Sequence, residues 1–167
     1  DGEWSESSGY QSTTRGIRGL AARASGQFSA AGDAQVERWQ GRKFTSTSSA
    51  ATLTGDGNSA SSANVIALPT HCTYSFTIFV TARKNDTDSA AWKIEGVIRR
   101  TVGGGDAAIA GTPVVTTLYS SSGATSDGWT ATVTADTTYD ALTVVVQNPA
   151  GTQVYWHADV TGRLVKG

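Results

Sequence analysis

The sequence has a single cysteine and no excess of charge of either sign, and each shortage excludes a class of protein. Cys72 has no second cysteine to pair with, so no disulfide can form within the chain. Neither His71 nor His157 has another ligand at the spacing of a metal site, so we expect no metal and no other cofactor. The net charge is −1 and 16% of the residues are charged, which predicts no nucleic-acid partner and no attraction to acidic membranes.

Long hydrophobic runs are also absent. No apolar stretch approaches the ~18 residues of a membrane span, and no charged-then-apolar segment of the signal-peptide type opens the chain. We therefore expect no membrane insertion, and if the protein acts outside a cell, we expect something other than secretion to carry it there. The length of 167 residues fits one packed domain with an appendage.

Bulky apolar side chains are scarce in the glycine-spaced run from Gly9 to Gly32. Ile17, Leu20 and Phe28 are its only large aliphatic or phenylalanine side chains. Ordering the backbone costs roughly 1–2 kcal/mol per residue, which so little apolar surface does not offset. We therefore predict that residues 1–34 form a Gly-rich stem that other copies of the chain cover, and the alternative is a disordered tail. The residues predicted at the interface between copies are Trp4, Tyr10, Ile17, Leu20 and Phe28.

The sequence changes in texture after a transition segment, residues 35–50. Residues 51–167 contain short runs of β-branched and aromatic residues separated by Gly, Ser, Asn and Asp, which is typical of a β-sandwich. The predicted strands are 35–45, 51–54, 65–68, 74–82, 92–98, 113–119, 129–135, 142–146 and 154–160. Trp92 and Trp156 lie in phase with apolar neighbours and are predicted in the core, and Asn148 to Gly151 predicts a hairpin turn.

These patterns predict an all-β fold class. We expect a short Gly-rich extended stem followed by an antiparallel, jelly-roll-like β-sandwich. The predicted division is a stem at 1–34, a transition at 35–50 and a C-terminal sandwich at 51–167.

Several motifs follow one another in a distinctive order. Gly32-Asp33-Ala34-Gln35 closes the stem, and the strand segments 89–100, 128–138, 141–146 and 154–160 come after it. In order and spacing they resemble the C-terminal portion of phage tail-fibre and tailspike proteins, over about residues 20–165. The resemblance implies a homotrimeric fibre tip in the virion tail, joined to other tail proteins upstream, that binds host-surface polysaccharide or lipopolysaccharide. The long β-helix that many tailspikes place upstream, where glycan-cleaving sites usually lie, is not in this chain.

Acidic residues occur in loops, but no pattern of a hydrolase accompanies them. A glycosidase needs two carboxyl groups roughly 5–10 Å apart across a cleft, whereas Asp136 and Asp140 are also what turns require. His157 and Asp159 share one face of a strand, yet no Gly-x-Ser-x-Gly elbow and no helix accompany them. A calcium loop at Asp86 lacks the glycine and distal glutamate of an EF-hand. We therefore predict no catalytic residues and no metal site.

Aromatic residues beside short polar ones suit sugar binding, because sugar rings stack on aromatic faces while their hydroxyls take hydrogen bonds. Tyr119 precedes a run of serines with Asp127 further along the same loop, and Tyr139 precedes Asp140. We predict these four residues as candidate glycan-binding residues; the alternative for each ring is packing over the edge of the sandwich. Tyr155 lies out of phase with the core and is expected to face solvent or a neighbouring subunit.

Three functions remain open at this point. The leading one is host-glycan binding by a trimeric fibre tip during adsorption. The second is a purely structural virion fibre or trimerisation cap, and the third is a glycan-degrading enzyme with acids at subunit clefts. Because no catalytic pair is evident, we predict that the protein is not an enzyme.

Overall fold

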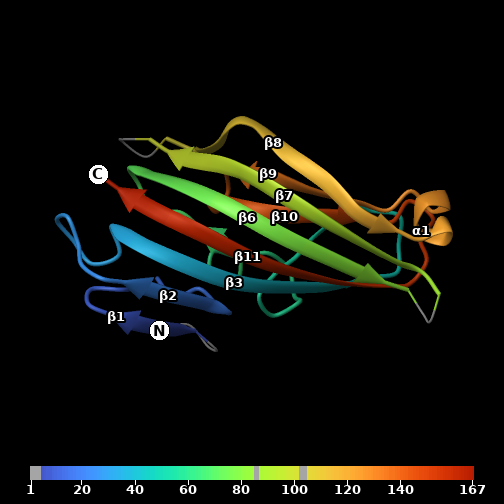
Figure 1. The fold of residues 1–167 in the computed structure, drawn as a ribbon, viewed down its shortest axis with the longest axis horizontal. Helices are drawn as coiled ribbons and strands as arrows, with labels where there is room; N and C mark the ends of the chain where they lie inside the picture. Colours follow the sequence, from blue (N-terminus) through green and yellow to red (C-terminus); the bar gives the residue numbers. More distant parts are fainter. Residues whose placement is uncertain (1–4, 85–86, 102–104) are drawn as a thin grey trace.

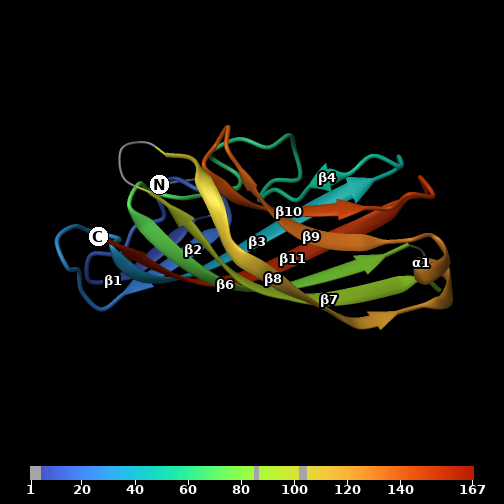
Figure 2. The same ribbon diagram turned by 90° about the horizontal axis from the view of Figure 1, so that it is seen from above.

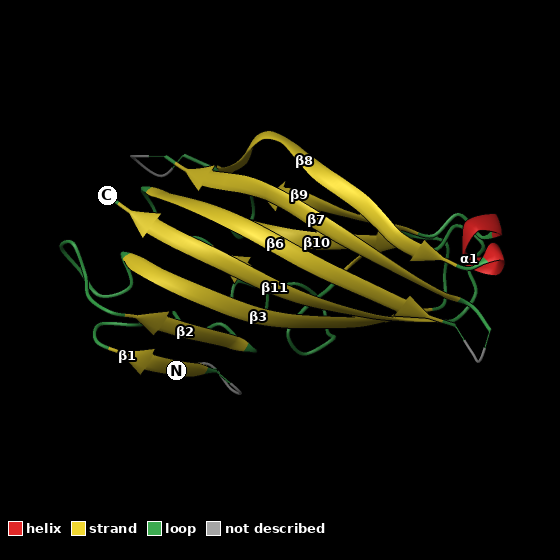
Figure 3. Ribbon diagram, in the orientation of Figure 1, coloured by secondary structure: helices red, strands yellow, loops and turns green. Residues whose placement is uncertain are grey.

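The structure is a computed structural model that describes residues 5–84, 87–101 and 105–167, and strands dominate this part of the chain (Figures 1 and 3). The elements are β1 (Glu6–Gly9), β2 (Leu20–Ala24), β3 (Ala34–Thr45), β4 (Ala51–Thr52), β5 (Ile66–Ala67), β6 (Cys72–Arg83), β7 (Ser89–Arg100), β8 (Ala107–Ser120), α1 (Ser122–Ser126), β9 (Thr130–Asp136), β10 (Ala141–Gln147) and β11 (Val154–Lys166). The predicted all-β fold class is confirmed, and each of the nine predicted strands is present.

The strands form two sheets that lie one above the other (Figure 2). The large sheet has the order β1-β2-β3-β11-β6-β7-β8. In the small sheet, β9 pairs with β10 along the whole length of β10, while β4 and β5 share the other edge of β10. Sheet neighbours run antiparallel, except that β1 and β2 run parallel. The fold is therefore a sandwich with one mixed sheet.

Strict alternation in the long central strands decides which face of the large sheet is covered. In β6, Tyr74, Phe76 and Ile78 are buried, whereas Phe79 and Thr81 are exposed. The same period continues through the thirteen residues of β11. Because side chains alternate between the faces of a strand, one face of the large sheet packs on the small sheet and the other is open to solvent. The open face and the edges of the large sheet are therefore its solvent-exposed surfaces.

Three tryptophans fill one region of the space between the sheets. Trp156 of β11 lies with its ring centroid 6.0 Å from that of Trp92 and 5.7 Å from that of Trp129. Its indole Nε1 donates a 2.9 Å hydrogen bond to Thr45 Oγ1. All three rings are buried, as predicted for Trp92 and Trp156, and aromatic pairs add about 0.5–1.5 kcal/mol beyond their burial.

The N-terminal segment, residues 5–33, is part of this fold and corrects one prediction. Ile17 and Leu20 are fully buried in the core of their own chain, together with residues of the large sheet. The prediction that other copies cover these two residues is therefore wrong, because the segment turns back and β2 pairs with β3 (Figure 1). Tyr10 and Phe28 are 69% and 75% exposed, and Trp4 lies outside the described residues. The large sheet takes strands from all three predicted regions, and the homotrimer stays a prediction.

Polar side chains at the start of β3 hold this segment. The Asp33 carboxylate accepts hydrogen bonds from the backbone N–H groups of Phe28, Ser29 and Ala30 at 2.9, 2.6 and 2.7 Å. Burial alone raises the pKa of Asp33, but these three donors outweigh it and lower the pKa to about 2. Asp33 belongs to the Gly32 to Gln35 motif, which is part of the resemblance described above. In the structure, this motif holds the residues that precede it in place.

Gln35 fastens the segment a second time, from inside the sandwich. Its Oε1 accepts from the Thr13 N–H at 3.1 Å, and its Nε2 donates to the Thr13 carbonyl at 2.9 Å. The same Nε2 donates to Glu37 Oε1 at 2.5 Å. A side-chain amide that pairs with both backbone groups of one residue acts as a short piece of strand, so Thr13 is fixed although it lies in a loop.

A buried ion pair completes the attachment. The Arg15 guanidinium pairs with both carboxylate oxygens of Glu37, whose side chain is fully buried. Burial lowers the pKa of Arg15, but the hydrogen bond and charge of Glu37 raise it above its ordinary value. The buried Tyr74 hydroxyl lies nearby and has no hydrogen-bond partner among the described residues. Its pKa is raised well above the ordinary value by burial and by the charge of Glu37. Gly162 makes room for this ring, because a Cβ there would lie 2.0 Å from the hydroxyl.

The turn at Asn148 corrects a second prediction. β10 belongs to the small sheet and β11 to the large one, so the connection passes from one layer to the other and does not form a hairpin. The buried Asn148 side chain donates through Nδ2 to the Thr152 carbonyl at 2.7 Å and to its Oγ1 at 2.9 Å. The predicted turn is present, but the residues of a turn do not determine whether the strands on either side of it pair with each other.

Candidate functional site

Two of the predicted glycan-binding residues, Tyr119 and Asp127, lie at the α1 end of the molecule. Tyr119 is exposed near the end of β8, and Asp127 is the C-cap of α1. Asp127 Oδ2 lies 3.1 Å from Lys84 Nζ and accepts a 3.4 Å hydrogen bond from Thr152 Oγ1. This carboxylate therefore links the helix to two neighbouring loops.

The other two, Tyr139 and Asp140, lie at the opposite end of β8. Asp140 forms an ion pair of 2.5 Å with Arg100, and its Oδ1 accepts from the N–H of Ala107, the first residue of β8. Tyr139 is half-buried in the turn between β9 and β10. The structure thus brings the four residues together as two separate pairs, and their contact with glycan stays a prediction.

A third region, which the sequence did not single out, lies on the open face of β3 and β11. Phe44 stands directly opposite Tyr155, and Arg42 directly opposite His157, in the antiparallel register of the two strands. The rings of Phe44 and Tyr155 have centroids 5.1 Å apart and are 46% and 63% exposed. We call these two rings the aromatic pair. The expectation that Tyr155 faces outward is confirmed.

A groove of about 630 Å³ adjoins the aromatic pair on the same face. It lies along the edge of β3, where pairing with β2 starts at Leu20, opposite Trp39. Further along the same edge, Thr54 takes the place of β2 and forms a β-bridge with Arg42. The side chains that give the groove its polar character are Glu6, Arg18, Arg38, Gln40, Arg42, Asp56 and His157. We call this feature the arginine groove.

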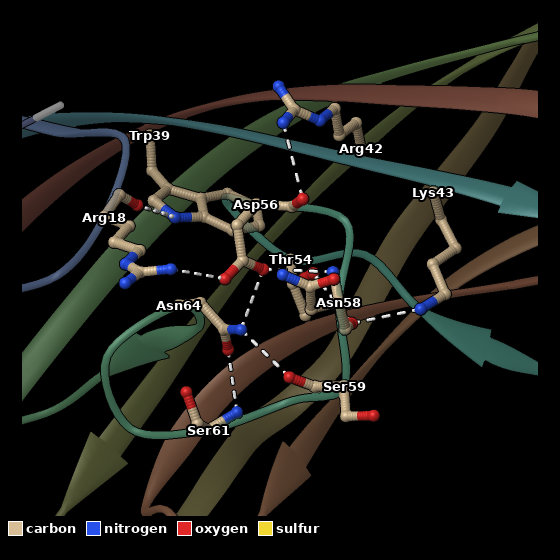
Figure 4. A network of polar contacts seen from close by, with 10 residues as sticks. All are labelled: Arg18, Trp39, Arg42, Lys43, Thr54, Asp56, Asn58, Ser59, Ser61 and Asn64. Atoms are coloured by element: carbon tan, nitrogen blue, oxygen red, sulfur yellow. Dashed lines mark hydrogen bonds and ion pairs between the residues drawn. The ribbon is translucent and has the colours of Figure 1, made fainter. Parts of the chain in front are cut away.

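Asp56 organises one wall of the arginine groove (Figure 4). Its Oδ1 accepts from the Asn58 N–H at 3.0 Å and from Asn64 Nδ2 at 2.9 Å, and its Oδ2 accepts from Arg18 Nη1 at 2.9 Å. Burial raises the pKa of Asp56, but these donors outweigh it and lower the pKa to about 2. Trp39 Nε1 donates to the Arg18 carbonyl at 3.1 Å, which ties this wall to the core.

The three arginines of the groove differ in how they are neutralised. Arg18 has Asp56 as its carboxylate partner, and Arg38 has Asp159, whose hydrogen bond and charge raise the pKa of Arg38. Arg42 is exposed and donates to the backbone carbonyl of Asp56 at 3.3 Å, and no carboxylate among the described residues contacts it. Among the described residues, Arg42 is thus the arginine of the groove that has no carboxylate partner.

Comparison with solved structures gives a distant likeness. No family of known proteins matches the sequence, and no curated protein does. Among solved structures, the chain is similar to the tailspike protein gp49 of the Acinetobacter baumannii bacteriophage Fri1, a capsular polysaccharide depolymerase. The identity is 9%, the TM-score is 0.42, and the match covers 89% of this chain and 20% of that one. A structural neighbour is thus a phage tailspike, of which this chain spans about a fifth.

The open face of β3 and β11 combines apolar and hydrogen-bonding groups. Flat exposed rings offer apolar surface, and an arginine offers up to five N–H donors. Within residues 5–84, 87–101 and 105–167, no three His, Cys, Asp or Glu side chains gather as a metal site requires. In the same ranges no helix has the length and apolar character to cross a membrane.

The edge strand β8 is the second unusual surface. Val114, Val115, Leu118 and Tyr119 are all exposed there. The pairing of β8 with β7 shifts register twice, once beside Leu118 and once near Gly111, so the usual alternation is lost and apolar residues emerge on both faces. Exposed apolar edges are typical of surfaces that another chain covers.

Proposed function

We propose that this protein is part of a phage tail fibre or tailspike and binds a glycan on the host surface through the open face of β3 and β11. The order of motifs along the sequence supports the first half of the proposal. The observation that carries the second half is the aromatic pair, Phe44 and Tyr155, exposed on a rigid sheet beside the arginine groove.

Rigid placement matters because a shallow sugar site gains little from any one contact. Phe44 and Tyr155 belong to strands that pair over twelve successive positions, so little conformational freedom is lost on binding. A single such site binds with a dissociation constant on the order of millimolar, and several copies on one particle raise the avidity by about 10²–10⁴. Attachment of a virion suits this arrangement.

The test is binding of the protein to host cells and to an array of bacterial surface glycans. Tyr155→Ala is expected to lower binding at least tenfold, because it removes the more exposed ring. Val165→Ala is the matched control, since Val165 is an exposed outward residue of the same strand far from the ring pair. Loss of binding in Tyr119→Ala with full binding in Tyr155→Ala would instead favour the residues predicted from the sequence.

A purely structural role in the virion is the second candidate, and the exposed β8 edge favours it. In this case the occupant of the edge is a second copy of the chain, within the predicted homotrimer. Leu118→Asp is then expected to shift the sedimentation coefficient from that of a trimer to that of a monomer. A wild-type protein that sediments as a monomer, or an unchanged Leu118→Asp trimer, speaks against this role for β8.

We further propose that the protein binds without cleaving. Three acids of its loops and groove are engaged by cations: Asp56 by Arg18, Asp127 by Lys84 and Asp140 by Arg100. A general acid needs a proton near neutral pH, and the low pKa of Asp56 is unsuitable for this task. Incubation with host polysaccharide is expected to release no new reducing ends, and their release would overturn this proposal.

A further inference from the structure

Arg42 is placed to respond to the charge of a saccharide bound on the open face. Arg42 points outward from β3 between the aromatic pair and the arginine groove, and it stands opposite His157. Outward positions two residues apart on a strand are separated by about 6.6 Å, so a sugar stacked on Phe44 lies one side-chain length from the Arg42 guanidinium.

The acids around the groove do not neutralise Arg42: Asp56 and Asp159 have other partners, and Glu6, on β1 beyond β2, forms no ion pair with it. Both Asp56 carboxylate oxygens accept hydrogen bonds from other groups, and the Asp159 carboxylate is engaged by Arg38. Asp56 offers Arg42 only its backbone carbonyl. A guanidinium with one neutral acceptor retains most of its donors for a planar anion.

The loop beside Arg42 also fixes where its guanidinium lies. Gly57 has a φ of +81°, and a Cβ at this position would lie 3.5 Å from Arg42 Nε. The guanidinium is thus seated over Gly57, with the Asp56 carbonyl at one end. The loop in turn is held by the hydrogen bonds of Asp56 and Asn64, so the arginine is positioned before any ligand arrives.

From this geometry we propose that the saccharide carries a carboxylate, and that Arg42 binds this carboxylate while the aromatic pair stacks on the sugar ring. This inference rests on the proposed function and adds the class of ligand to it: an acidic saccharide, of the kind that contains uronic or similar sugar acids. The charge-assisted hydrogen bonds between a guanidinium and a carboxylate are the stronger class, so they decide between acidic and neutral sugars.

The experiment compares two forms of one host polysaccharide: the native acidic form, and a form whose carboxyl groups have been chemically reduced to alcohols. The wild-type protein is expected to bind the acidic form at least tenfold more tightly, with the preference shrinking in high salt. Arg42→Gln is expected to lose this preference while keeping its affinity for the reduced form. Arg163→Gln, at an outward and exposed position of β11 that does not line the groove, is the matched control and keeps the preference.

The possible outcomes separate the two proposals. Equal binding of both forms by the wild type overturns the carboxylate inference and leaves glycan binding in place. Binding of neither form overturns both. Loss of binding to both forms in Arg42→Gln, with an unchanged circular-dichroism spectrum, assigns Arg42 to sugar binding in general and also overturns its role as the reader of charge.

Discussion

The N-terminal segment and the centre of the sandwich are ordered by different chemistry. Around Trp156, three indole rings and many aliphatic side chains exclude water. Residues 5–33 contribute little apolar surface, and they are held by Asp33, Gln35 and the Arg15–Glu37 pair. A scarcity of apolar residues therefore does not mean that a segment lacks partners within its own chain, because polar side chains from a neighbouring strand can fasten it.

The largest effect is expected from Trp156→Ala in the sandwich. The change removes two ring contacts and the hydrogen bond to Thr45 and leaves a cavity, so the free energy of unfolding should fall by about 3–5 kcal/mol. Denaturant unfolding measures it. If Trp156→Ala lowered the free energy of unfolding by less than a polar substitution in the N-terminal segment does, the polar contacts would stabilise the fold more than the tryptophan core.

Arg15→Met should come next, with a loss of about 3 kcal/mol. It leaves the buried Glu37 carboxylate without its cation, and breaking a buried pair from one side is costly. The double variant Arg15→Met/Glu37→Leu removes both charges and is expected to recover much of the loss. Equal stability of the single and double variants would show that the pair does not fasten the segment.

Gln35→Ala tests the next attachment, and its expected cost is about 1–2 kcal/mol. The change removes the two hydrogen bonds to Thr13 and the one to Glu37, while the apolar side chains of the core are untouched. Limited proteolysis should then cut within residues 10–32 faster than in the wild type, although the melting temperature changes only modestly. Cleavage at β6 or β11 instead would indicate global unfolding.

Acid should weaken the polar attachments selectively. The folded pKa values of Asp33 and Asp56 lie at about 2, below their ordinary value of 3.8, so the unfolded chain takes up these protons first. Their contribution to stability is therefore complete above about pH 5 and is lost as the pH falls from about 4 toward 2. Thermal melts across this range should show a smaller loss for Asp33→Asn and Asp56→Asn than for the wild type.

The smallest effect on the single chain is expected from Phe28→Asp. Its side chain is 75% exposed, so the unfolding free energy of the monomer should change by less than about 0.5 kcal/mol. If Phe28 and Tyr10 contact other copies as predicted, the same change lowers trimer stability in sedimentation experiments. An unchanged trimer would remove Phe28 from the predicted interface.

Much of the fold could be predicted because strand alternation is a local property. Every predicted strand is present, and the burial of Trp92 and Trp156 follows from their phase with apolar neighbours. β1 and β2 were missed because Glu6–Gly9 carries no apolar alternation and Leu20–Ala24 is mostly alanine. The burial of Ile17 and Leu20 within their own chain depends on the pairing of β2 with β3, which the amino-acid composition does not reveal.

The candidate site depended on register between distant strands. Phe44 and Tyr155 are separated by more than a hundred residues and meet because β3 and β11 pair with Phe44 opposite Tyr155. A shift of one residue in this pairing would bring a buried position of one strand to the open face. Sequence reasoning could place Tyr155 outward, but it had no means to find its partner or the arginine groove beside it.

The position of β11 has a consequence for how the molecule forms. β11 follows the other described strands in sequence, yet it lies in the middle of the large sheet, between β3 and β6, and pairs with twelve residues of each. The two halves of that sheet, β1-β2-β3 and β6-β7-β8, cannot be joined until β11 has been synthesised. Because many contacts therefore link residues far apart in the sequence, folding should be slow. Until then β3 and β6 present open edges, and Phe44 and Arg42 have no neighbours opposite them. A face divided between β3 and β11 forms only once both strands have been made, so a chain truncated before β11 would lack the aromatic pair.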